Sequence, residues 1–146
     1  MNPRLDDLAL RSSLLRFVPG PERSALLAAF ETVRYAFGEE IVVEGEAADA
    51  WYIVLSGRAR VLKRQPDGSE LMLGRLLAGD EFGEAALADG GVRNATVRAS
   101  TSIELLRLSR QRFRSLVAMY PELERAVVLQ SRWRALHGFL YQFSDF

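Results

Sequence analysis

A glycine, a glutamate and an arginine lie close together in this chain, with the side chains needed to bind a small anion that also carries hydroxyl groups. Gly83 and Glu84 are adjacent, and Arg93 follows nine residues after the glutamate. Gly83 has no Cβ, so a ligand can approach its backbone closely. Arg93 offers a planar fork of N–H donors that suits a phosphate, whereas Glu84 would accept hydrogen bonds from sugar hydroxyls. A ligand with both a phosphate and a ribose would satisfy both side chains.

A short helix is expected to begin at this glycine and to complete the anion site. Residues 84–88 read Glu-Ala-Ala-Leu-Ala, and all are good helix formers. The first amides of such a helix have no intrahelical partner and point towards an anion at its end. Ala85 and Ala86 are small enough for the ligand to lie against those amides. The turn at residues 89–91 then brings Arg93 back to the same place.

These residues resemble the phosphate-binding cassette of the cyclic nucleotide-binding domain family, of the catabolite activator protein and protein kinase A regulatory subunit type. The family pattern is F-G-E-x-A-L, a short turn, and R-(S/T/A)-A-(T/S)-V. This sequence supplies FGEAAL from residue 82 and RNATV from residue 93. The resemblance extends to FGEEI at 37–41, WYIVLSG at 51–57 and RLLAGD at 75–80, and covers about residues 14–123.

The resemblance implies a cyclic nucleotide ligand and a set of residues that bind it. The phosphate and ribose would contact the cassette and the start of the next strand: Phe82, Gly83, Glu84, Ala85, Ala86, Arg93, Asn94 and Ala95. The purine would lie against Val61, Leu73 and Leu76, and Trp133 is a candidate lid, although packing of its helix on the roll is the competing interpretation. Asn94 departs from the family pattern: members that prefer cyclic GMP often have Thr or Ser here. Cyclic AMP is favoured over cyclic GMP.

The composition of the chain argues against several other classes of function. The chain has 146 residues, no cysteine, one histidine and a formal net charge of zero. Disulfides and thiolate metal sites are excluded, and neither a metal site nor general attraction to nucleic acid is expected. Nothing resembles a P-loop, a nucleophile elbow or a catalytic triad, so no catalytic residue is proposed and an enzyme is not expected. Without an apolar run long enough to span a bilayer, the expected location is cytoplasmic, or the cytoplasmic face of a membrane protein if the chain is a piece of one.

The pattern of elements predicts helices, then about eight short strands interrupted by the cassette helix, then helices. The resemblance implies that these form an α+β domain built on an eight-stranded antiparallel β-roll, or jelly roll, with helices at both ends. A cyclic nucleotide-binding domain is expected over residues 1–120, with a helical N-terminus at 3–30, the roll at 31–108 and a helix at 110–120. Short β-branched and aromatic runs separated by glycines indicate a barrel or sandwich of short strands. Within it, residues 51–55 read as a strand buried on both sides, and Asp67-Gly68 as a hairpin turn. Ser109 is the expected N-cap of the helix that follows.

Residues 121–146 are interpreted as a C-terminal lid or connector helix. Residues 135–143 share a pattern with residues 9–17, so the C-terminus could begin a second, similar domain. The segment could instead link to an effector outside this chain or form a dimer. The basic residues near this end are interpreted as a solvated helical face: Arg107, Arg110, Arg112, Arg114, Arg125, Arg132 and Arg134. The leading function is a regulatory sensor that changes its flanking helices when a cyclic nucleotide binds. The alternative is a domain of the same fold without ligand that acts as a protein interaction module.

Overall fold

The computed structural model describes residues 18, 20–83, 91–126 and 129, which form two four-stranded sheets and two helices with assigned bounds. The elements, in chain order, are α2 (Gly20–Ala29), β1 (Glu31–Tyr35), β2 (Glu40–Val42), β3 (Ala50–Ser56), β4 (Ala59–Arg64), β5 (Glu70–Leu76), β6 (Glu81–Phe82), β7 (Thr96–Ala99), β8 (Ile103–Ser109) and α4 (Arg110–Met119). One sheet has the strand order β1-β8-β3-β6 and the other β2-β7-β4-β5, and every pairing is antiparallel. The predicted eight-stranded antiparallel roll is confirmed.

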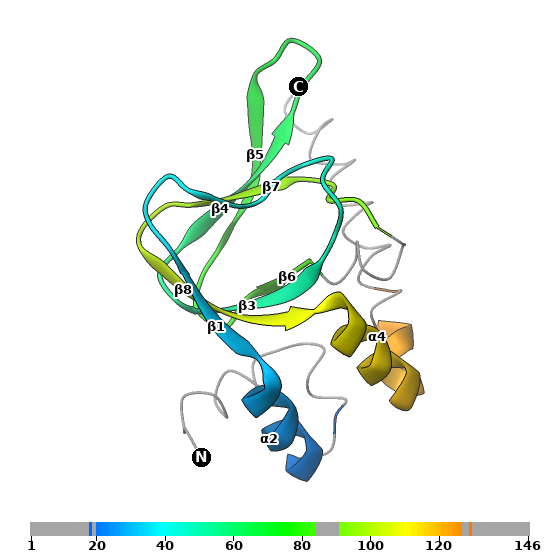
Figure 1. Ribbon diagram of the computed structural model, residues 1–146. Coiled ribbons are helices and arrows are strands. Elements are labelled where there is room, and N and C mark those ends of the chain that lie inside the picture. Colours follow the sequence, from blue (N-terminus) through cyan, green and yellow to red (C-terminus); the bar gives the residue numbers. More distant parts are fainter. Residues whose placement is uncertain (1–17, 19, 84–90, 127–128, 130–146) are drawn as a thin grey trace.

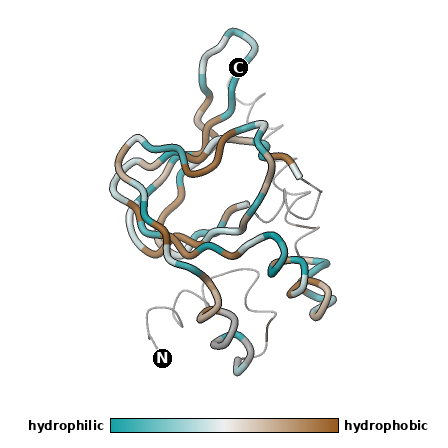
Figure 2. The backbone as a smooth tube through the Cα atoms, viewed as in Figure 1, coloured by the Kyte–Doolittle hydropathy of each residue, from teal (hydrophilic) through white to brown (hydrophobic). Residues whose placement is uncertain are grey.

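The first of these sheets lies between the interior of the roll and the helices α2 and α4 (Figure 1). An apolar core lies on each of its faces. On its outer face Trp51 contacts Phe30 and Phe113, with ring centroids 6.0 and 5.2 Å apart, so both flanking helices pack there. On its inner face Tyr52 and Val54 face residues of the other sheet, inside the roll. Strand β3 therefore has a nearly continuous apolar run because both of its faces are covered. Figure 2 shows the same pattern along the backbone, with brown segments in the strands.

The β4–β5 hairpin projects from the roll and carries an irregularity that the sequence did not indicate. Its turn lies at Asp67-Gly68, as expected, and Gly68 has a φ of 87°. The tip is hydrophilic (Figure 2). Val61 lies opposite Gly74, whereas the next residue, Leu62, lies opposite Met72. Leu73 is therefore the extra residue of a β-bulge, a feature that redirects side chains and increases local twist.

The helix that follows the roll is capped at both ends by contacts that fix where it begins and stops. The Ser109 hydroxyl accepts a hydrogen bond from the amide of Arg112, as predicted for an N-cap. At the other end the Tyr120 amide donates to the carbonyls of Leu116 and Val117, and the Tyr120 carbonyl accepts from Leu123. Residues 121–126 are again helical. The chain thus changes direction at Tyr120 and Pro121, because proline is compatible with the first helical position but ends the preceding helix.

Loss of the Ser109 cap should destabilise the domain modestly. We expect Ser109→Ala to lower the free energy of unfolding by about 0.5–2 kcal/mol, because the amide of Arg112 loses its acceptor. Ser115→Ala is the matched control, since Ser115 lies within the same helix and its hydroxyl only donates to the Gln111 carbonyl. Urea denaturation measures both. A Ser109 variant as stable as the Ser115 variant would contradict the capping role.

The proposed division at residue 120 and the lid or connector at 121–146 remain predictions. Residues 3–17 and most of 127–146 lie outside the described residues. Leu123 is fully buried against the outer core, so the segment after Pro121 at least begins on the roll.

Candidate functional site

Arg93 is the best-defined residue of the predicted cassette, and its side chain points into the protein. The guanidinium is 4% exposed. Its Nη2 donates to the Ala50 carbonyl at 2.7 Å and to the Asp49 carboxylate at 3.2 Å, and its Nη1 donates to the Gly83 carbonyl at 3.3 Å. These contacts join the start of β3, the end of β6 and the segment before β7. Gly83 and Arg93, two of the residues predicted to bind the ligand, are therefore in direct contact.

Backbone pairing holds Arg93 beside the loop that precedes β3. The Arg93 amide donates to the Glu46 carbonyl, and the Arg93 carbonyl accepts from Gly45, both at 2.9 Å. One residue earlier, Val92 forms a β-bridge with Ala47. The position of the guanidinium is therefore fixed by main-chain contacts on both sides of the residue.

Gly83 is required by this arrangement for two reasons. Its φ is 96°, a conformation that residues with a side chain rarely adopt. A Cβ at this position would lie 2.6 Å from Nη1 of Arg93 and 2.8 Å from the Ala50 carbonyl oxygen. The glycine therefore permits both the turn and the close approach of the arginine.

Two further charged residues belong to the site and were not predicted. Asp49 is 64% exposed, and its two carboxylate oxygens contact different arginines, one Arg93 and the other Arg107, at 3.2 Å each. Arg107 also forms an ion pair with Glu31. The interpretation of Arg107 as part of a solvated helical face was wrong, since it lies in β8 opposite Glu31 and Tyr52. Nothing in local sequence spacing relates residues that are 44 and 58 positions apart.

Arg107 keeps its charge in this environment. Burial disfavours the guanidinium, but hydrogen bonds with Tyr52 and Glu31 outweigh it and raise the pKa of Arg107 above its ordinary value. Burial, with a further contribution from Tyr52, raises the pKa of the Tyr35 phenol. The Tyr35 phenol is thus neutral near pH 7.

Aromatic residues form the wall next to the arginine. Phe82, one of the predicted ligand residues, is buried and stacks on Tyr52 with a centroid separation of 4.9 Å and an interplanar angle of 10°. The guanidinium carbon of Arg93 lies 5.9 Å from the centre of the Tyr52 ring. A cation at this distance from an aromatic face is attracted by the ring quadrupole. Phe82 therefore supports the arginine through Tyr52.

The three aliphatic residues assigned to the base pocket have different surroundings. Leu76 is buried in the inner core, and Val61 is half-buried against it. Leu73 is also half-buried, at the bulge of β5. Ala95 is half-buried, whereas Asn94 is exposed and its carbonyl accepts a hydrogen bond from Lys63 at 2.7 Å. The assignment of Val61, Leu73 and Leu76 to a purine pocket stays a prediction.

The remaining predicted site residues lie outside the described part of the chain: Glu84, Ala85, Ala86 and Trp133. Among the described residues, no group of three or more His, Cys, Asp or Glu side chains could hold a metal ion. In the same part of the chain, no helix is long and apolar enough to cross a membrane.

The strand order, the helices on one sheet and the buried arginine in contact with Gly83 together define a β-roll with helices on the outer face of one sheet. A family model described as "Cyclic nucleotide-binding domain" matches residues 32–120. The chain belongs to the cyclic nucleotide-binding domain family.

Two relatives of this chain are regulatory proteins. The chain is 34% identical over 128 residues to a cAMP-dependent protein kinase regulatory subunit from Emericella nidulans, covering 88% of this chain and 29% of that protein. It is 29% identical over 119 residues to a CRP-like cAMP-activated global transcriptional regulator from Mycobacterium tuberculosis, covering 82% of this chain and 53% of the regulator. The chain therefore spans about half, or less, of the length of these relatives.

Solved structures show the same fold. The regulatory domain of Toxoplasma gondii PKA, crystallised with cAMP, superposes with a TM-score of 0.77 at 28% identity, covering 91% of this chain and 49% of that one. The predicted resemblance to the catabolite activator protein and protein kinase A regulatory subunit type is confirmed.

Proposed function

We propose that this domain is a sensor that binds a cyclic nucleotide, cyclic AMP in preference to cyclic GMP, and passes its occupancy to an effector through its C-terminal helices. The observation that supports this most is the buried Arg93, which is positioned by main-chain contacts on both sides and lies beneath a glycine with a positive φ. Relatives described as cAMP-activated or cAMP-dependent support the choice of ligand. The proposed role is regulatory rather than catalytic, and the proposed setting is cytoplasmic.

Arg93 has donors left for a phosphate. A guanidinium carries five N–H groups in a fixed fork. Its hydrogen bonds to the described residues number three, from Nη1 and Nη2, and none of them uses Nε. We propose that the cyclic phosphate binds at the remaining donors and at the first amides after Gly83. Glu84 would then accept from the ribose 2′-hydroxyl, with Ala85 and Ala86 beside the phosphate.

Titration with nucleotides tests the proposal directly. We expect cyclic AMP to stabilise the domain by about 2.7 kcal/mol at a hundred-fold excess over Kd, which raises the Tm by roughly 5–11 °C for a domain of this size. Cyclic GMP, a cyclic dinucleotide and 2′-deoxy cyclic AMP are the comparison ligands, and calorimetry gives the affinities. If 2′-deoxy cyclic AMP binds as tightly as cyclic AMP, Glu84 does not accept a hydrogen bond from the ribose 2′-hydroxyl. If none of these nucleotides raises the Tm, the domain is better explained as an interaction module that binds no cyclic nucleotide.

The alternative is an interaction domain of the same fold without ligand. It is favoured by one observation, that Arg93 already has protein acceptors at Asp49 and Ala50. Against it, the sequence retains both the glutamate and the arginine of the cassette. The titration above separates the two functions.

Asp49 is expected to strengthen cyclic AMP binding without being essential for it. We expect Asp49→Ala to weaken cyclic AMP binding by roughly two- to thirty-fold, because two partly exposed ion pairs that hold Arg93 and Arg107 are lost. Glu46→Ala is the control, since Glu46 is exposed in the same loop and its replacement removes the same charge. If both variants bind with wild-type affinity by calorimetry, Asp49 does not position the arginine.

The change of direction at Tyr120 is the proposed hinge of the switch. Leu123 is buried against Trp51 and Phe113, so the segment after Pro121 is already in contact with the roll in this state. A ligand can move it only to the extent that it binds one arrangement more tightly than the other. We propose that ordering of the cassette shifts this segment, and that residues 121–146 connect to an effector or to a second copy of the domain. Hydrogen exchange of residues 110–126 with and without cyclic AMP would report the shift.

A further inference from the structure

Three arginines lie side by side across the second sheet. Arg60 on β4 is directly opposite Arg98 on β7 and directly opposite Arg75 on β5. Their neighbours Val61, Val97 and Leu76 belong to the inner core. Since successive side chains of a strand point to opposite faces, the arginine row lies on the outer face, away from the proposed nucleotide site.

Like charges directly opposite one another in a sheet are unfavourable, and within the described part of the chain only Arg98 of this row forms an ion pair. Arg98 forms a bidentate pair with Glu70 at 2.8 and 3.0 Å and contacts Glu40 at 3.9 Å. Its hydrogen bonds hold the pKa of Glu70 below the usual value. No ion pair among the described residues includes Arg60 or Arg75.

Arg60 is the most constrained member of the row. Its Nε atom is inaccessible to solvent and has no hydrogen-bond partner in the described structure. A buried donor without an acceptor is costly, because it has given up its contact with water. Arg75, beside it, is exposed. An acceptor placed over Arg60 and Arg75 would reduce the repulsion between them.

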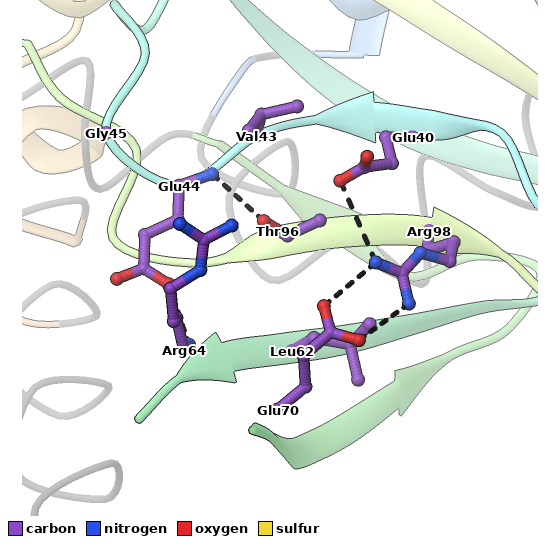
Figure 3. Close-up of a pocket in the computed structure, with 9 residues that line it drawn as sticks. All are labelled: Glu40, Val43, Glu44, Gly45, Leu62, Arg64, Glu70, Thr96 and Arg98. Carbon is purple, nitrogen blue, oxygen red and sulfur yellow. Dashed lines mark hydrogen bonds and ion pairs between the residues drawn. The ribbon is translucent and has the colours of Figure 1, made fainter. Parts of the chain in front are cut away.

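A pocket of about 260 Å³ adjoins the row on the same face (Figure 3). Its apolar lining includes Leu62, which is 5% exposed, and Val43. Arg64 and Arg98 stand at its sides, and Arg64 has no ion pair with the described residues. In Figure 3 the Arg98 guanidinium lies between Glu40 and Glu70. The face therefore combines a pocket of mixed polar and apolar lining with three arginines, at positions 60, 64 and 75, that have no ion pair with the described residues.

We propose that this outer face is a docking surface for an acidic segment of a partner protein. Carboxylates of the segment bind Arg60, Arg64 and Arg75, and an apolar side chain between them enters the pocket over Leu62. A nucleic acid fits less well, because it has no aliphatic side chain to place over Leu62 and Val43, whereas a protein segment can supply one. The surface is separate from the proposed nucleotide site.

The test uses fluorescein-labelled peptides of sequence EELEELEE and QQLQQLQQ, with fluorescence anisotropy at low ionic strength. The first peptide is expected to bind the wild-type chain and the second to bind more weakly. Arg60→Gln/Arg75→Gln should lose roughly two- to thirty-fold in affinity for EELEELEE, the range for two exposed ion pairs. The control, Arg34→Gln/Arg114→Gln, removes the same charge from β1 and α4 and should bind as the wild type does. An oligonucleotide of single-stranded DNA is titrated in parallel.

Three results would overturn the docking surface. They are no binding of EELEELEE to the wild type, equal loss in the control variant, and tighter binding of the oligonucleotide than of the peptide. The Tm of the Arg60/Arg75 variant is measured as well as its binding. If the arginines only stabilise the fold, the variant should have a lower Tm. If they serve to bind a partner, its Tm should be unchanged or higher. Cyclic AMP affinity of this variant should equal that of the wild type, so failure here is distinguishable from failure of the nucleotide site.

Discussion

Replacing Arg93 with alanine is expected to weaken cyclic AMP binding by roughly thirty-fold to several thousand-fold. The guanidinium is 4% exposed, so a phosphate bound to it would be partly removed from water. Loss of one partner of a buried charged pair costs about 2–5 kcal/mol, and about 1.4 kcal/mol corresponds to a factor of ten. Binding at micromolar ligand should therefore disappear. Isothermal titration calorimetry measures the affinity, and circular dichroism checks that the roll is intact.

Arg98→Ala is the matched control for this variant. Arg98 lies five positions further along the chain, but on the outer face, where it pairs with Glu70. It should retain cyclic AMP affinity. Arg93→Lys is expected to recover only part of the loss, because an ammonium cannot form the planar fork of donors. Unchanged affinity of Arg93→Ala would remove this residue from the site and with it the main support for a nucleotide sensor.

The sequence predicted the fold well because local features set most of it. A continuous apolar run at 51–55 needs cover on both faces, and Asp67-Gly68 needs a tight turn, whatever the rest of the chain does. Ser109 before a helical pattern predicts a cap for the same reason. Such signals act over a few residues, so they can be interpreted without knowing which strands pair.

The charged surroundings of Arg93 could not be predicted in this way. Asp49 and Arg107 reach it only because β3 pairs with β8 and the loop before β3 pairs with residues 91–93. Local spacing does not encode which strand becomes a neighbour, and Arg107 was misassigned to a helical face for this reason. The bulge that leaves Leu73 without a partner on β4 was missed for a similar reason, since it depends on the register of two strands.

Adding a single methyl group at Gly83 is expected to disturb both stability and binding. Alanine at a φ of 96° is strained, which costs on the order of 1–3 kcal/mol. Its Cβ would also lie 2.6 Å from Nη1 of Arg93 and 2.8 Å from the Ala50 carbonyl oxygen. The arginine can move away, but it then loses its bonds to Gly83 and Ala50. A hydrogen bond to a charged group is worth about 1.5–3 kcal/mol, so cyclic AMP affinity should fall by roughly ten- to a hundred-fold.

Gly38→Ala is the control that separates the steric contact with Arg93 from the backbone strain of a positive φ. Gly38 has a φ of 85°, close to that of Gly83, but a Cβ there meets no heavy atom within 4 Å. Gly83→Ala should lose at least as much stability as Gly38→Ala in urea denaturation, and only Gly83→Ala should lose affinity in calorimetry. If Gly83→Ala binds cyclic AMP as tightly as Gly38→Ala does, the guanidinium does not need its observed position for binding. The phosphate would then be held elsewhere in the cassette, and the contact between Gly83 and Arg93 would serve only the turn.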